Sequence, residues 1–162
     1  MMHLNEMGPR EDFNWEAADT LRYCGLDVGH LPHMATHLDF QVGNYKDAIK
    51  YNQIGIAADE IVLEKYPESA SIYYGYYLHN VEFCVWAAMY GGNKKIAIET
   101  VVKMREALKE NLLRQPLMDQ ELEAFLATEI MVLVRFGLWD DILKLEFNSD
   151  KRLYIAHTMF LH

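Results

Sequence analysis

The chain has 162 residues, of which 51% are apolar, so it is long enough to fold around a core of its own. Its 24 acidic residues outnumber its 15 basic residues and leave a net charge of -9, which disfavours binding to nucleic acid or to an anionic membrane surface. The cysteines Cys24 and Cys84 have no metal-binding or disulfide spacing and are expected to be reduced. No signal-peptide pattern or membrane-spanning stretch is present, so we expect a cytoplasmic protein.

Glycine and proline separate long segments with helical periodicity, and strand signals are weak, because no alternating run of useful length is bounded by an Asn-Gly or Asp-Gly turn. These features predict an all-α protein. After a histidine-bearing segment that starts near residue 29, the predicted helices cover residues 45–66, 71–90, 94–113, 119–136 and 139–145, and a further apolar-striped helix begins at 150.

A sequence pattern recurs along the chain. The residues around Gly43 recur 49 positions later around Gly92, and Gly137 follows after a further 45 positions. Repeats of this length, each with a helix, a glycine turn and a second helix, are typical of α-solenoids. We therefore expect a single repeat domain over 1–162, with about three hairpins and flanking helices. The expected repeat units are 29–66, 71–114 and 119–146, with a partial unit at 150–162.

Solenoids need polar caps at their ends, whereas the final segment has an apolar stripe. We therefore expect the chain to be part of a longer array, or to self-associate through its C-terminal helix.

Three stretches, VGNYKDAIKYNQIGIAAD, GGNKKIAIETVVKM and FGLWDDILKLEF, resemble tetratricopeptide repeats. The stretches GHLPHMATHLDFQVGNYKDAIKYNQIGIAAD, YYGYYLHNVEF and FGLWDDIL are similar to an uncharacterised, bacterial-type family of tetratricopeptide-like proteins, which shows the patterns GHxxHMPSH, YxHNxHF and FGxWxxxL. The resemblance implies a helical-repeat fold with a polar face, and it names no activity. Glu82 replaces the second histidine of the middle pattern, and the matching polar residues are His30, His33, His37, His79 and Asn80.

Three histidines of the predicted helix that starts near residue 29 lie on one stripe. The i, i+3, i+7 spacing of His30, His33 and His37 places them on one side of a helix. The 49-residue repeat places His79, Glu82 and Trp86 on the equivalent stripe of the next repeat. Because the first helices of adjacent repeats pack side by side, we expect the two stripes to form one face.

The first hypothesis for this face is a concave groove in a tetratricopeptide-like binding or scaffold module. Aromatic and polar side chains together suit a peptide or a small-molecule ligand. The candidate ligand-binding residues are His30, His33, His37, His79, Asn80, Glu82, Trp86 and Tyr90.

Two other hypotheses remain open. His33, His37, His79 and Glu82 form a candidate site for a divalent transition metal, because imidazole and carboxylate groups suit zinc, iron, manganese or nickel. Alternatively, the histidines only hydrogen-bond across the repeat interface and stiffen the stack. The sequence has no motif for a nucleophile or a phosphate-binding loop, so it favours binding over catalysis, and any enzyme activity depends on the histidine face.

Histidines outside this face have no patterned partner, and we predict no role for His3, His157 or His162. We also predict that the acidic pairs Asp59–Glu60 and Asp140–Asp141 lie on solvated helix faces or at helix ends.

Overall fold

A computed structural model describes residues 2–24, 28–66, 70–111, 119–145 and 158, and this part of the chain contains helices and turns and no strand. The prediction of an all-α protein is thereby confirmed for these residues. The chain divides into two compact units, Met1–Asn93 and Lys94–His162. The predicted helix at 150–162 and its proposed self-association lie outside the described residues.

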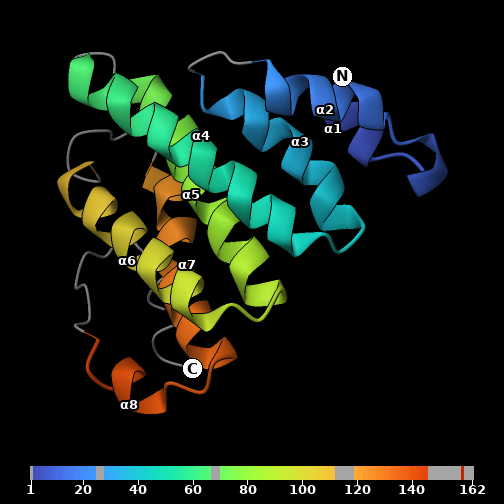
Figure 1. Ribbon diagram of the computed structural model, residues 1–162. Helices are drawn as coiled ribbons and strands as arrows, with labels where there is room; N and C mark the ends of the chain where they lie inside the picture. Colours follow the sequence, from blue (N-terminus) through green and yellow to red (C-terminus); the bar gives the residue numbers. More distant parts are fainter. Residues whose placement is uncertain (1, 25–27, 67–69, 112–118, 146–157, 159–162) are drawn as a thin grey trace. The chain divides into compact units, whose positions relative to one another are not determined.

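The first unit contains five α-helices among its described residues (Figure 1). In chain order they are α1 (Met2–Glu6), α2 (Trp15–Tyr23), α3 (His30–Gln41), α4 (Tyr45–Lys65) and α5 (Ala70–Tyr90), with a 3-10 turn at Arg10–Asp12 before α2. In Figure 1, α3 lies between α2 and α4 and contacts both, and α5 packs against α4 and α3. Helix α1 also packs on α3.

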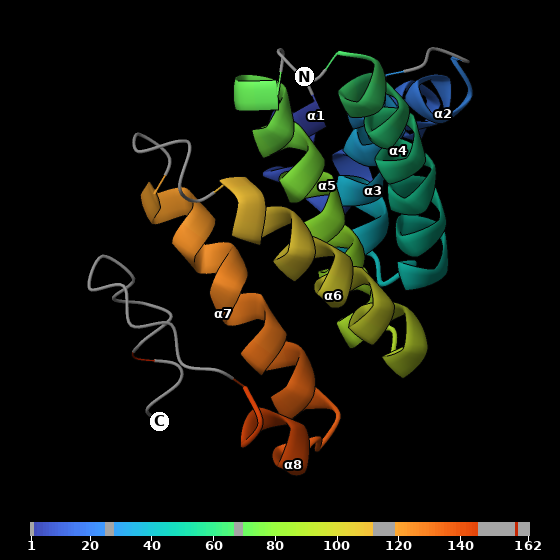
Figure 2. The same cartoon turned by 90° about the vertical axis from the view of Figure 1, so that its left-hand side faces the viewer.

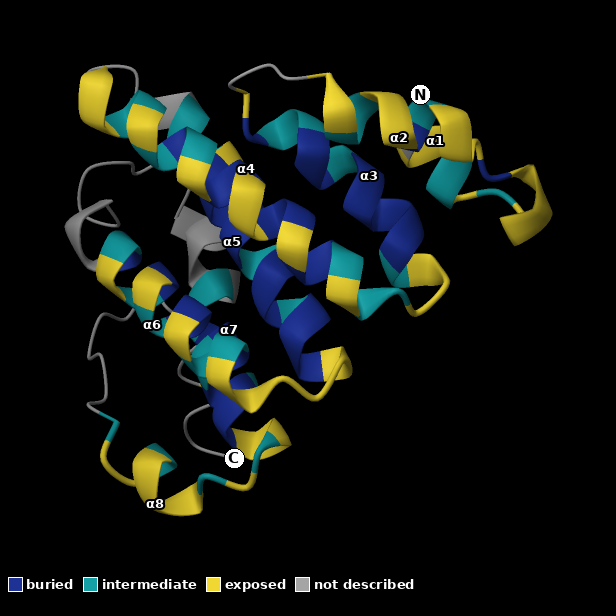
Figure 3. Cartoon of the chain, in the orientation of Figure 1, coloured by how far each residue is buried: buried dark blue, intermediate teal, exposed yellow. Residues whose placement is uncertain are grey.

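Helix α3 is buried along most of its length because neighbours cover it on several sides (Figure 3). Leu38 of α3 is fully buried, as are Leu78, Val81 and Val85 of α5. Ala35 and Leu38 also form a small core with Phe13 and Ala18 from the α2 side. The helix that carries most of the histidines is therefore a central element of this unit, and its polar side chains must find partners inside the fold.

The repeated glycines end helices in the same way. Gly43, Gly92 and Gly137 have φ values of 79°, 70° and 65°, a left-handed conformation that glycine adopts without a steric cost. In each turn the amide of the residue after the glycine donates to the carbonyl five positions earlier, as in Asn44 to Asp39 at 2.8 Å. This hydrogen bond is that of a Schellman turn. The sequence repeat thus corresponds to a repeated local structure.

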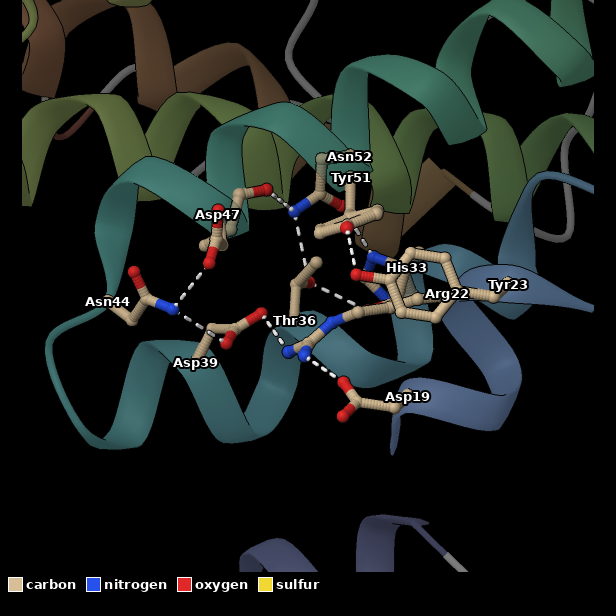
Figure 4. Close-up of polar contacts among 11 residues, drawn as sticks. Asp19, Arg22, Tyr23, His33, Thr36, Asp39, Asn44, Asp47, Tyr51 and Asn52 are labelled. Atoms are coloured by element: carbon tan, nitrogen blue, oxygen red, sulfur yellow. Dashed lines mark hydrogen bonds and ion pairs between the residues drawn. The ribbon is translucent and has the colours of Figure 1, made fainter. Parts of the chain in front are cut away.

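A buried ion pair fixes α2 to α3 (Figure 4). Nη2 of Arg22 donates to Oδ2 of Asp39 at 2.6 Å, and the Asp39 side chain is 1% exposed. The other oxygen of Asp39 accepts from Asn44 in the following turn at 3.1 Å. Burial raises the pKa of Asp39, while Arg22 opposes that shift. Both carboxylate oxygens are therefore paired, as a buried carboxylate requires.

The start of α3 approaches the middle of α4 very closely. A methyl group added at Gly55 would lie 2.5 Å from the backbone oxygen of Gly29. Both positions therefore require a residue without a side chain. The contact brings the backbone of α3 close to α4 in the same region where their polar side chains meet.

The second unit contains α6 (Lys94–Asn111), α7 (Asp119–Arg135) and the short α8 (Trp139–Ile142). Helices α6 and α7 run side by side in opposite directions (Figure 2). Arg105 of α6 donates to Glu129 of α7 at 2.5 Å, and Val101, Met104 and Val132 are buried. Among the described residues of the whole chain, no helix is both long enough and apolar enough to cross a membrane.

Replacing Gly55 by alanine tests the close approach of α3 and α4. Alanine favours a helix by about 1 kcal/mol over glycine. The overlap with a backbone oxygen should outweigh that gain, so we expect a lower free energy of unfolding, by about 1–3 kcal/mol. Urea denaturation measures this free energy of unfolding. Gly8→Ala is the matched control, because its added methyl meets its nearest atom at an ordinary 3.4 Å. A stabilised Gly55→Ala variant would contradict the observed contact.

Candidate metal centre

Three histidines from two helices converge in the first unit. The three residues are His33 and His37 on α3 and His79 on α5. Each offers one ring nitrogen, and the three nitrogens lie within 4.8 Å of one another. The ring of His33 is 4.7 Å from that of His79 and 4.8 Å from that of His37. His30 stacks on His33 at 5.0 Å but lies outside this group of candidate ligands. The predicted convergence of the two histidine stripes is therefore present for these four residues.

Asn52 of α4 determines which nitrogen of His33 carries the proton (Figure 4). Nδ2 of Asn52 donates to Thr36 Oγ1 at 3.0 Å and to the Ala48 carbonyl at 2.7 Å. Its Oδ1 is therefore the atom that faces Nδ1 of His33, at 2.7 Å. Because an amide oxygen only accepts, His33 must carry its proton on Nδ1. Nε2 of the neutral ring then has a free lone pair.

His37 contacts both a histidine and a carboxylate. Its Nε2 lies 3.0 Å from Nε2 of His33. On the other side of the ring, Nδ1 lies 2.6 Å from Oε2 of Glu6 in α1. That oxygen has no well-aligned hydrogen bond within the described residues, so the contact is a close approach without the direction of a hydrogen bond. His37 therefore lies between a lone pair of His33 and a carboxylate oxygen.

Neither neutral form of His37 satisfies both contacts. A proton on Nε2 can be donated to His33, but the Nδ1 lone pair then faces the Glu6 carboxylate. A proton on Nδ1 suits Glu6, but two lone pairs then face each other across 3.0 Å. Either an additional proton on the His37–Glu6 pair or a cation between the two Nε2 atoms removes the conflict.

Burial keeps the histidines neutral. It lowers the pKa of His33 to about 2, against the opposing effect of Asn52. It lowers the pKa of His37 to about 3, with further lowering by His3, His79 and His30. The Glu6 carboxylate, 2.6 Å from Nδ1, favours the charged form of the ring by itself. The pKa of His79 is also lowered, first by burial and then by His30 and His3. Neutral imidazoles are the form that binds metal ions.

His30 and Asn80 form a second polar contact next to the group. Nδ2 of Asn80 donates to Oδ2 of Asp59 at 2.6 Å, and Tyr73 donates to the other oxygen at 2.7 Å. Burial lowers the pKa of His30, and the nearby Asn80 side chain opposes that shift. Nδ1 of His30 and Oδ1 of Asn80 are buried without an aligned hydrogen bond in the described part of the chain. Asp59 and Asn80 thus support the group without belonging to it.

The remaining predicted ligand-binding residues lie elsewhere on α5. Glu82 is half-buried and belongs to neither group of candidate metal ligands among the described residues. Phe83 takes the place beside the histidines that the repeat pattern assigned to Glu82, because its ring contacts His33 at 5.1 Å and His37 at 4.5 Å. Trp86 and Tyr90 lie together, 6.1 Å apart, further along the helix.

The face is more enclosed than an open groove. His33 and Asn80 are 0% exposed and His37 is 7% exposed, because α1 and α5 pack over this side of α3. A peptide at the surface therefore has no access to these three side chains in this conformation.

Sequence reasoning missed several residues around the group. No role was predicted for His3, yet its ring lies 4.8 Å from that of His37, and Glu6 accompanies it. Asp59, predicted on a solvated face or at a helix end, is 1% exposed because α5 packs against α4, and its carboxylate accepts hydrogen bonds from α5. One signal was available, since Asn52 interrupts the apolar stripe of residues 45–66 and a polar group at a core position requires a partner.

The chain matches no family model, no curated protein and no solved structure.

The stability of the metal-free protein should depend on pH through these histidines. Their pKa values in the folded state, about 2 for His33 and about 3 for His37, lie below the ordinary 6.5. The unfolded chain therefore binds more protons below pH 6.5, and stability is lost as the pH falls below this value, by about 1.4 kcal/mol per pH unit for each such histidine.

Urea denaturation between pH 7.5 and 5, in the presence of a chelator, measures this loss above the range in which most carboxylates titrate. The variant His37→Gln has one titrating group fewer and should show a shallower dependence than the unchanged protein. Equal slopes for the two proteins would show that His37 is not held neutral by the fold.

Proposed function

We propose that this protein binds a divalent transition-metal ion through Nε2 of His33, Nε2 of His37 and a ring nitrogen of His79. One observation carries the proposal: two buried, neutral histidines present their Nε2 atoms to each other at 3.0 Å, while their Nδ1 atoms face Asn52 and Glu6. Metal-binding histidines usually donate the far N–H of the ring to an oxygen that orients it, as His33 does to Asn52.

The distances suit a metal ion after small movements. Nitrogens bound to zinc at 2.0–2.1 Å lie about 3.3–3.4 Å apart in a tetrahedral site and about 2.9 Å apart at a right angle. The separation of 3.0 Å between His33 and His37 falls within this range. A nitrogen of His79 lies within 4.8 Å of a nitrogen of each of the other two, so an approach of at most about 1.5 Å brings it to the spacing of a tetrahedral site. The ring of His79 lies against the rings of His30, His33, His37 and Phe83, at 4.7–6.1 Å between ring centres.

The nature of the ligands narrows the choice of ion. Three imidazoles without a thiolate suit zinc, iron, nickel or copper better than magnesium or calcium, which prefer oxygen ligands. Three protein ligands leave at least one position for water or substrate, as in catalytic zinc sites. A bound ion would supply a Lewis acid that lowers the pKa of such a water. The chain's contribution is to orient His33 through Asn52, to place the Glu6 carboxylate beside His37 and to exclude bulk solvent.

Metal analysis with ligand variants tests this proposal. The protein purified without chelator, then dialysed against zinc, should retain one zinc ion bound by His33, His37 and His79, as measured by mass spectrometry. His79→Gln should weaken zinc binding by more than the 10–100-fold that loss of an outer partner costs, and Asn52→Leu should weaken it by about that amount.

Glu82→Gln is the matched control, because the repeat pattern predicts Glu82 as a ligand while the structure leaves it out of the group. We expect its zinc affinity to be unchanged. A protein that retains no zinc, or whose affinity falls with Glu82→Gln and not with His79→Gln, would rule out this centre.

A second candidate function, that of a tetratricopeptide-like solenoid that binds peptides, is supported by an aromatic surface at the end of α5. Tyr90 is 55% exposed, and its ring lies 5.3 Å from Phe40 and 6.0 Å from Tyr45. Trp86 lies 6.1 Å away on the same helix. Rigid aromatic rings at a surface are common anchors for protein partners. On this proposal the ligand binds Trp86 and Tyr90, and the buried histidines only support them.

Peptides selected by phage display against the protein test this second function. Tyr90→Ser should reduce the affinity of a selected peptide at least about tenfold, because truncating an aromatic anchor commonly costs 1–2 kcal/mol or more. Tyr66→Ser removes a tyrosine that is 47% exposed and lies at the end of α4, and it should have no effect. If both variants reduce the affinity equally, or neither does, the aromatic surface is not the peptide site.

A further inference from the structure

His37 belongs to two groups of candidate metal ligands. The inner group is His33, His37 and His79, and the outer group is His3, Glu6 and His37. Each group offers one ligand atom per residue, with the atoms of that group within 4.8 Å of one another. The two groups lie on opposite sides of one ring, since Nε2 of His37 faces His33 and Nδ1 faces Glu6.

The outer group includes the most exposed of these ligands. His33 is fully buried and His79 is half-buried, the side chains of His37 and Glu6 are 8% and 22% exposed, and that of His3 is 57% exposed. An ion that enters the inner group exchanges its bound water for protein ligands. Among the described residues, the outer group offers three such ligands close to solvent. The net charge of -9 also attracts cations toward the molecule.

The outer group is held in place by hydrogen bonds of α1. Asn5, between His3 and Glu6, donates to the carbonyl of Asp12 at 2.9 Å, and its Oδ1 accepts from the amide of Asn14 at 2.6 Å. Asn14 in turn caps α2 by accepting from the amide of Ala17 at 2.9 Å. Helix α1 is therefore fixed to the start of α2 while Glu6 contacts His37.

We propose that His3, Glu6 and His37 form a loading site that takes a divalent transition-metal ion from solvent and passes it to His33, His37 and His79. The inference rests on the proposed metal centre and adds a route into it. Histidine and carboxylate ligands together suit zinc, cobalt and nickel, so the outer group accepts the same ions as the inner group.

A neutral imidazole has one lone pair, so His37 holds one ion at a time. With its proton on Nε2, the ring offers Nδ1 to an ion at the outer group. When the proton moves from Nε2 to Nδ1, where Glu6 is the nearest carboxylate, the ring offers Nε2 to the inner group. The charge of the ring and the number of its protons are the same before and after the transfer.

Stopped-flow uptake of cobalt(II), followed by its visible absorption, tests the loading site in the full chain. We expect His3→Gln to slow cobalt uptake at least tenfold while the equilibrium affinity changes much less. Glu16→Gln, which removes an exposed carboxylate on α2 outside both groups, should load at the unchanged rate. If His3→Gln loads as fast as the unchanged protein, the loading site is overturned and the inner centre is not.

A second measurement isolates the outer group. With the inner centre weakened by His79→Gln, the protein should still bind one cobalt ion weakly, and adding His3→Gln should abolish that binding. Absence of weak binding in His79→Gln would overturn the loading site. A protein that binds no cobalt before any substitution would overturn the inner centre and, with it, the route.

Discussion

The hydrogen bond from His33 to Asn52 determines the chemistry of the whole histidine group. Asn52 uses both protons of its amide nitrogen on Thr36 and the Ala48 carbonyl, so only its oxygen is left for His33. His33 therefore carries its proton on Nδ1, and the lone pair on its Nε2 faces His37. A leucine at position 52 would leave the direction and tautomer of the ring undetermined.

The fold places this hydrogen bond where water cannot compete with it. The close approach at Gly29 and Gly55 brings α3 against α4, and α1 and α5 cover the other side of α3. Burial lowers the pKa values of His33 and His37 and keeps both rings neutral. Burying imidazoles in a fixed orientation costs more free energy than burying apolar residues in the same space, because each ring nitrogen needs a partner. This cost favours a role in ligation over the hypothesis that the histidines only stiffen the interface.

Much of this arrangement could be predicted from the sequence, because it depends on local periodicity. The glycine repeat predicted the helix ends, and the i, i+3, i+7 spacing predicted that His30, His33 and His37 share a stripe that meets His79. The contribution of α1 could not be predicted, because the five-residue helix that carries His3 and Glu6 has no repeat partner and is positioned by contacts with distant residues. Glu82 and Phe83 differ by one position, and helix packing, which the repeat does not determine, selects Phe83 as the neighbour of the histidines.

X-ray absorption spectroscopy of the zinc-loaded protein tests the metal centre most directly, because it reports the atoms bound to the ion. If His33, His37 and His79 bind the ion, its first shell should consist of nitrogen and oxygen at about 2.0–2.1 Å, with the outer-ring scattering of about three imidazoles and no sulfur. A first shell with sulfur at about 2.3 Å, or one made of oxygen without imidazole scattering, would contradict the assignment of His33, His37 and His79 as ligands.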